Sequence, residues 1–254
     1  TKEALAKHPG FDILRRLLSG SALLQELLVF VHPDPSLAGF EVVNQDRAQT
    51  PEFARAVRGV LRILLRVLDV QPLLLHTLLP AWSDAVVGDR AQLVPLEVHL
   101  LHAHQVVVQL ALYVNCIDAD MAWLSVRLVS ALARTSTFQA SDAFGPLRAR
   151  TSMNRLAGLL EMTGEAARVT SGAVAWLDAK PDSTESPTEA ADPLSAPAGA
   201  AQVQEALLEL LLAQTARHVP APNVAHLLLG FEPEATAPDR LVPVSYTHLT
   251  LPTN

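Results

Sequence analysis

The feature that most constrains the fold is the segment from Thr50 to Asp69, which is apolar on two sides. It opens with Thr50-Pro51-Glu52, a capping hydroxyl followed by proline at the first helical position and an acid in the first turn. At about 100° per residue, the polar residues fall within an arc of roughly 80°, and the apolar residues spread over about 200° on the other side. The polar positions are Arg55, Arg58, Arg62, Arg66 and Asp69, and the apolar positions are Phe53, Val57, Val60, Leu61, Ile63, Leu64, Val67 and Leu68. A helix with so narrow a polar stripe contacts neighbours on two sides.

The arginine stripe of this segment has two functional interpretations and one structural one. Four arginines exclude a transmembrane helix. A phosphate-binding surface is a weaker interpretation than a solvated helix face. We therefore expect Arg55, Arg58, Arg62 and Arg66 to be exposed or capped by acidic side chains, and we expect Val60 and Leu64 to be buried.

The remaining well-defined segments also have helical spacing and mostly short connections. Leucine, valine and alanine supply the apolar residues, whereas aromatic residues make up only 5% of the chain, so helix is favoured over sheet and we expect no β-sheet. The expected helices cover residues 11–31 with a break at Ser19-Gly20-Ser21, 72–79, 93–114, 118–132, 153–161, 166–177, 202–216 and 222–229.

The pattern of modest helices, many of them apolar on two faces, predicts the all-α class and, within it, an irregular HEAT/ARM-like α-solenoid of stacked helix pairs. No fixed repeat period is present, which excludes the standard tetratricopeptide and ankyrin repeats. We expect one solenoid segment over residues 1–178, its continuation over 201–232, and an unstructured tail over 233–254.

Residues 179–200 differ from the rest of the chain, because they contain four prolines, four acids and almost no large apolar residue. Such a segment buries too little surface to offset the entropy of ordering, so we expect a disordered acidic loop. Ser186-Pro187 within it matches a proline-directed phosphorylation motif.

Both ends of the sequence look incomplete or artificial. The chain begins at Thr1 in a segment that already resembles a helix, so an upstream part is expected. Residues 244–254 resemble the translated read-through of a sequencing adaptor and are left out of the fold prediction.

The overall charge argues against nucleic acid as a direct partner. The formal net charge is −7, and no cluster of lysine and arginine is dense enough to follow a phosphate backbone. The single cysteine, Cys116, cannot form an internal disulfide, which favours a reducing compartment.

No constellation of residues indicates catalysis or metal binding. His99 and His102 lie about 60° apart on a helix, but His104 lies about 140° from His99, so the three imidazoles do not converge. Asp118 and Asp120 begin a helix, where the dipole favours acids without a catalytic role. We therefore predict no catalytic, cofactor-binding or metal-binding residue, no cofactor, no small-molecule substrate and no enzymatic activity.

Four segments, in order, resemble the large inner-ring scaffold nucleoporins of the 205/192 type. They are His8 to Leu14, Val106 to Val114 with Ala119 to Leu132, Met153 to Leu159 with Ala166 to Leu177, and Ala221 to Phe231. The resemblance implies a segment of a long α-solenoid in the nuclear pore complex at the nuclear envelope. It also implies a structural role in nucleocytoplasmic transport, with other scaffold and linker nucleoporins as partners.

Three alternatives remain open at the level of sequence. The sister scaffold of the 188 type has a related architecture. A karyopherin-like transport receptor also stacks HEAT-like pairs, but it predicts regular pairs with acidic inner helices, which the irregular helix lengths and the arginine stripe do not match. An enzyme would need a pocket with convergent polar groups, and the motifs provide none.

Overall fold

The computed structural model describes residues 8–31, 51–81, 93–139, 154–180, 198–216, 219, 223–234 and 237–243. Most of them are helical, and the fold class is all-α, as predicted. The arrangement of these helices as a solenoid stays a prediction. Of the segment 179–200 that was predicted to be disordered, residues 181–197 with Ser186 lie outside the described residues, as do the adaptor-like residues 244–254.

The first helices are α2 (Pro9–Leu18) and α3 (Ala22–Val31), which the break at residues 19–21 separates as predicted. His8 caps α2, because its side chain accepts a hydrogen bond from the backbone N–H of Gly10. Gly20 has φ 66°, in the left-handed region that glycine adopts without strain. A Cβ at this position would lie 2.8 Å from Cε1 of His99, so both backbone and space require glycine.

The long helix α5 (Pro51–Pro72) begins at the predicted capping sequence and continues further than predicted. A separate helix over residues 72–79 was expected, but α5 runs through Pro72 into a π-helical segment, η1 (Leu73–Leu78), and a 3₁₀ turn, η2 (Leu79–Ala81). The prediction was wrong because proline removes a backbone donor and crowds the preceding turn, and a change of helical pitch accommodates both without breaking the helix.

The predicted helix over residues 93–114 is divided into three parts. They are α7 (Leu96–His102), α8 (His104–Leu112) and the 3₁₀ turn η4 (Tyr113–Asn115). The division falls at Ala103, whose φ −98° and ψ 52° leave the helical region.

The remaining helices match the predicted segments to within a few residues. They are α9 (Ala119–Ala133), α11 (Arg155–Met162), α12 (Ala166–Asp178), α13 (Ala200–Gln214) and α14 (Val224–Leu228), with a short additional helix α10 (Ser136–Gln139). Residues 198–200, expected at the end of the disordered loop, instead lead into α13, with Gly199 as its N-cap.

A β-hairpin follows α14 and contradicts the prediction of a chain without β-sheet. Its strands β1 (Phe231–Glu234) and β2 (Ala237–Pro243) pair antiparallel, so part of the expected unstructured tail over residues 233–254 is ordered. The composition of the whole chain, which favours helix, gave no sign of this local pairing, and each strand also contains proline. A two-stranded ribbon has only edge strands, however, and proline is tolerated there. Within the described residues of 11–230 no strand occurs, as predicted.

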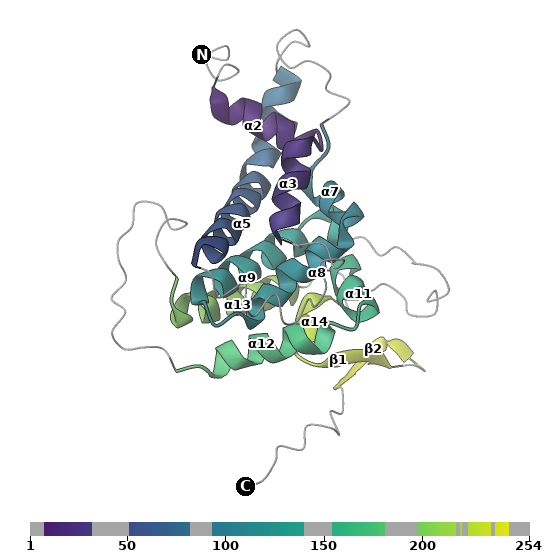
Figure 1. The fold of residues 1–254 in the computed structure, drawn as a ribbon. Helices are drawn as coiled ribbons and strands as arrows, with labels where there is room; N and C mark the ends of the chain where they lie inside the picture. The colour runs from purple at the N-terminus through teal and green to yellow at the C-terminus, as the bar shows by residue number, and fades with distance from the viewer. Residues whose placement is uncertain are drawn as a thin grey trace.

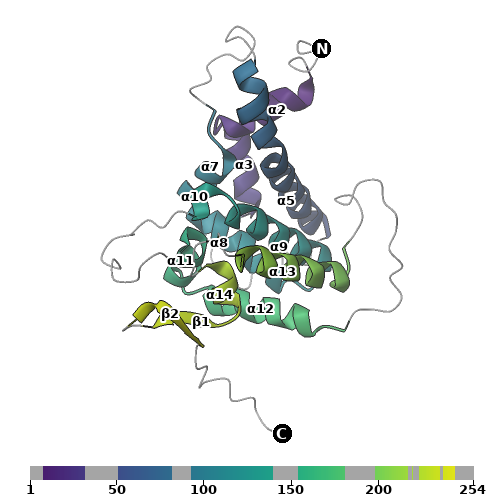
Figure 2. The ribbon, with the colours of Figure 1, turned by 180° about the vertical axis from the view of Figure 1, so that it is seen from behind.

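Helix α9 lies at the centre of the molecule, with α5 on one side and α13 on the other (Figure 1). The first helices α2 and α3 and the C-terminal half of α5 lie at one end, and α12 and the hairpin lie at the opposite end, as the view from behind also shows (Figure 2). A single apolar cluster extends from Leu17 to Leu227 through these helices, so one core supports the described elements.

Candidate functional site

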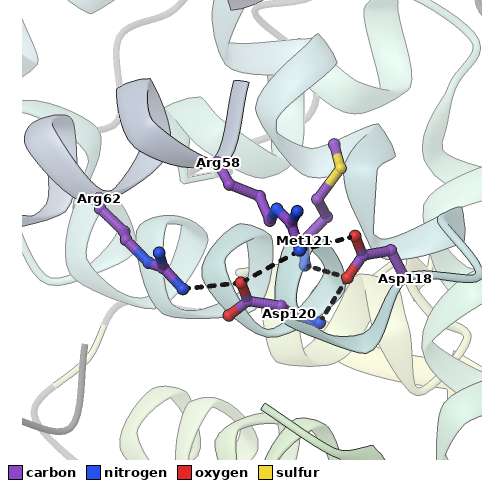
Figure 3. A network of polar contacts seen from close by, with 5 residues as sticks. All are labelled: Arg58, Arg62, Asp118, Asp120 and Met121. Atoms are coloured by element: carbon purple, nitrogen blue, oxygen red, sulfur yellow. Dashed lines mark hydrogen bonds and ion pairs between the residues drawn. The ribbon is translucent and has the colours of Figure 1, made fainter. Parts of the chain in front are cut away.

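The most distinctive polar feature is a charged joint where α5 crosses the start of α9. Arg58 and Arg62 are one turn apart on α5 and point toward Asp118 and Asp120 (Figure 3). Nη2 of Arg62 lies 2.7 Å from Oδ2 of Asp120, and Nη1 of Arg58 lies 3.3 Å from Oδ2 of Asp118 and 3.7 Å from Oδ2 of Asp120. We call these four residues the charged joint.

Asp118 has two roles in the charged joint. It is the N-cap of α9, where its Oδ1 accepts hydrogen bonds from the backbone N–H groups of Asp120 at 3.0 Å and Met121 at 3.4 Å. Its Oδ2 faces Arg58. The carboxylate therefore fixes the start of α9 and pairs with α5 at the same time.

Asp120 is the buried member of the joint. Its side chain is 5% exposed, against 29% for Arg58 and 33% for Arg62. Oδ2 of Asp120 faces both guanidinium groups, while its buried Oδ1 has no hydrogen-bond partner among the described residues. A buried carboxylate needs a counter-charge, and α5 supplies two.

The prediction that the four arginines of α5 are either exposed or capped by acidic side chains is therefore confirmed. Arg55 and Arg66 are exposed, and Arg58 and Arg62 are paired with acids. Val60 and Leu64 are buried, also as predicted. The sequence interpretation of Asp120 was incomplete, because it assigned this residue only to the polar start of a helix. The helical spacing of α9 could have predicted that Asp120 is buried. Asp120 lies on the same face as Leu124 and Leu128, one and two turns further on, and both leucines are fully buried.

The three histidines whose imidazoles were predicted not to converge, His99, His102 and His104, have separate surroundings. Nε2 of His99 lies 3.0 Å from the carbonyl oxygen of Leu18, and Nδ1 of His102 lies 2.7 Å from that of Val98. His104 lies beside Gln105. Over the described ranges, no group of three or more His, Cys, Asp or Glu side chains is placed to hold a metal ion.

The environment of Cys116 disfavours its reactive form. Burial, with a further contribution from the charge of Asp118, raises the pKa of the thiol to about 11. A thiol with so high a pKa carries little thiolate at neutral pH, and the thiolate is the nucleophile.

Several helices present apolar side chains to solvent. On α13, Leu208 is 52% exposed and Leu212 73% exposed, and Ile117, between η4 and α9, is 99% exposed. Other exposed apolar positions lie on α3, α5, η1 and α12: Leu23, Val29, Phe30, Ile63, Val70, Leu73, Val174 and Leu177. These exposed apolar side chains are distributed over several helices.

None of the helices in the described part of the chain has both the length and the apolar character that a membrane span requires.

Comparison with known proteins connects this architecture to one family. The family model described as nuclear pore complex scaffold, nucleoporins 186/192/205, matches residues 1–238. A search of curated proteins finds no match. The matched range includes the charged joint and every helix described above, and no finding favours the karyopherin-like alternative.

Proposed function

Because the chain belongs to the family of nuclear pore complex scaffold nucleoporins of the 186/192/205 type, we propose that it forms part of an inner-ring α-solenoid that holds other nucleoporins in place. As a member of this family it is a scaffold nucleoporin and a component of the nuclear pore complex at the nuclear envelope. The proposal adds the position in the inner ring, the solenoid arrangement and the manner of binding.

The observation that carries the proposal is the family match over residues 1–238, which coincides with a helical chain. The exposed apolar side chains on several helices support binding through lateral surfaces. Helices packed side by side offer large surfaces and few convergent polar groups, which suits holding partners rather than converting substrates.

The partners that we propose are scaffold and linker nucleoporins, and the role that we propose is structural. The formal net charge of −7 supports protein rather than nucleic acid as the direct partner. The family is a structural scaffold of the pore, which supports the proposal that the chain has no enzymatic activity.

The test is the exchange of the full-length protein at the nuclear rim. The protein would be tagged with a fluorescent protein in cells, and recovery after photobleaching would be measured at the rim, beside a freely exchanging transport receptor as the control. A structural component recovers over hours. Recovery within seconds, as for the receptor, or a diffuse cytoplasmic signal would overturn the proposal.

A further inference from the structure

The N-terminal unit of the molecule, residues 8–31 and 51–81, is connected to the rest by specific polar contacts. The backbone N–H of Val94 donates to the carbonyl oxygen of Leu18 at 2.9 Å, and Leu96 N–H donates to Oε1 of Gln71 at 2.8 Å. The hydroxyl of Tyr113 donates to the carbonyl oxygen of Val31 at 3.0 Å. The charged joint adds ion pairs to these hydrogen bonds, and it connects the two long helices α5 and α9.

The apolar contact between α5 and α9 is extensive but not directional. Leu61 and Leu64 on α5 and Leu124 and Leu128 on α9 are fully buried. Hydrophobic burial is not directional, and helix packing permits a range of crossing geometries, so apolar burial alone defines the crossing point less strictly than an ion pair does. The 2.7 Å contact between Arg62 and Asp120 does define a crossing point. A slip by one residue would move a helix by about 1.5 Å along its axis and would break this contact.

The geometry of Asp120 indicates that it contributes more to position than to stability. Both guanidinium groups face the same oxygen, Oδ2, while the buried Oδ1 of Asp120 and the buried Nε of Arg62 have no hydrogen-bond partner among the described residues. A buried ion pair that leaves polar atoms unsatisfied does not fully recover its desolvation cost. Apolar residues of similar size would serve stability at least as well.

We propose that Asp120 is a positioning residue that sets where α5 crosses α9, with Arg58 and Arg62 as a two-point clamp on its carboxylate. The clamp fixes the position of the N-terminal unit against the helices that follow. Its biological meaning rests on the proposed scaffold function, since a scaffold must present its surfaces at fixed angles. The test below measures only the joint, so its failure leaves the rim experiment unaffected.

The experiment measures distances between spin labels by pulsed electron paramagnetic resonance in the 254-residue chain. The single native cysteine is first removed by Cys116→Ala. Labels at Glu52→Cys on α5 and Ala167→Cys on α12, both exposed, report the position of α5. A second pair, Ala167→Cys and Glu205→Cys, lies on α12 and α13 and serves as the internal control.

The main variant is Arg62→Leu with Asp120→Leu, which replaces the clamp by apolar side chains. We expect the melting temperature to stay the same or rise, while the distance distribution from Glu52 to Ala167 broadens to about twice its original width. The control distances between α12 and α13 stay unchanged. The matched control variant, Arg127→Leu with Glu209→Leu, removes an exposed ion pair between α9 and α13 and leaves the distribution from Glu52 to Ala167 as it was.

A second variant, Asp120→Asn, keeps the shape of the side chain and removes its charge, so it decides the question if the double variant does not fold. Broadening in this variant supports the proposal. An unchanged distribution in a folded variant, whether Asp120→Asn or the double leucine variant, would show that apolar packing alone sets the crossing and would overturn it.

Discussion

Leu64 and Ile63 are neighbours in α5 with opposite surroundings, and they test the assignment of the buried face at the scale of single residues. Leu64 is fully buried, whereas Ile63 is 41% exposed. Leu64→Ala is expected to lower the free energy of unfolding by about 2–5 kcal/mol, because it removes transfer energy and leaves a cavity. Ile63→Ala is expected to change it by less than about 0.5 kcal/mol, as at an ordinary surface position. Urea titration followed by circular dichroism measures both, and equal losses would contradict the assignment.

His226 gives a prediction about pH. It stands three residues after Asn223, the N-cap of α14, and its Nδ1 accepts from the backbone N–H of Asn223. Burial lowers the pKa of His226 below its usual value of 6.5. The unfolded chain therefore binds a proton at a higher pH than the folded protein does. The stability that His226 contributes is complete above pH 6.5 and is lost as the pH falls toward the pKa of the folded state.

The matching variant is His226→Gln, since glutamine at this position can accept the same backbone hydrogen bond and does not titrate. We expect the melting temperature of the variant to fall less than that of the original protein between neutral and mildly acidic pH. Scanning calorimetry over this range measures the melting temperature of both proteins. The other histidines are present in both, so their contributions are removed when the two curves are subtracted. Parallel curves would show that His226 does not couple folding to pH.

The sequence predicted one side of the charged joint but not the other. The arc of arginines on α5 followed from helical geometry, which left open whether each arginine is exposed or capped by an acidic side chain. The partner itself could not be identified from that helix, because Asp120 is 58 positions away from Arg62 along the chain. Periodicity assigns a face to each residue of one helix but does not say which helix lies against it. Ile63, placed in the apolar arc by the same geometry, is exposed for this reason.

At the scale of elements, two helix-interior glycines differ in what surrounds them. A Cβ on Gly59 in α5 would meet nothing within 4 Å, whereas a Cβ on Gly172 in α12 would lie 2.5 Å from Oδ1 of Asn115 and 3.0 Å from Cγ1 of Val114. Gly59→Ala is expected to stabilise the protein by about 0.4–1 kcal/mol through the lower entropy of the unfolded chain. Gly172→Ala is expected to destabilise it by about 1–3 kcal/mol, because the side chains of Asn115 and Val114 on η4 must shift to make room.

Chemical denaturation measures the free energy of unfolding of the two alanine variants, which is expected to rise for Gly59→Ala and to fall for Gly172→Ala. The pair is matched, since both substitutions add the same methyl group inside a helix and differ only in the neighbouring element. A stabilising effect of Gly172→Ala would mean that the side chains of Asn115 and Val114 make room for the added methyl group at little cost.

The division between α7 and α8 is a helix boundary that the sequence missed. Prolines and capping residues marked the starts of α5 and α9, where the signal is local. The division between α7 and α8 falls at an alanine, a residue with no local preference for ending a helix. His99 on α7 contacts the end of α2, while Ser125 of α9 donates to the carbonyl oxygen of Leu110 on α8. Tertiary contacts with different partners, not the local sequence, divide the segment.

At the scale of the whole molecule, the described helices share one apolar core. The cluster that includes Leu17 and Leu24 in the N-terminal unit is continuous with the one that includes Leu207 and Leu210 in α13. Sequence patterning identified most of the core residues helix by helix, but it could not show that they form one cluster. It also could not show that α9 lies between α5 and α13, since no repeat period indicates the order of packing.

A single core leads to the last prediction, which concerns cooperativity. In a stack of helix pairs, each unit contacts only its neighbours, and an end unit can open before the rest. In this chain the N-terminal unit shares the apolar cluster and is also tied to later residues by the contacts of Leu18, Gln71, Val31 and the charged joint. Separating it would expose the fully buried leucines of α5 and α9 to water. Opening the end unit alone therefore exposes part of the shared core, which favours unfolding of the molecule as one cooperative unit.

We accordingly expect one unfolding transition, with the calorimetric enthalpy equal to the van't Hoff enthalpy. Hydrogen exchange in low denaturant supplies the second measurement, in which the slowest amides of α3 and α9 should exchange with the same free energy of opening. An earlier transition that releases α3 before α9 would show that the ties are weaker than their burial indicates. The N-terminal unit would then behave as an end repeat that needs a neighbour in the pore to hold it.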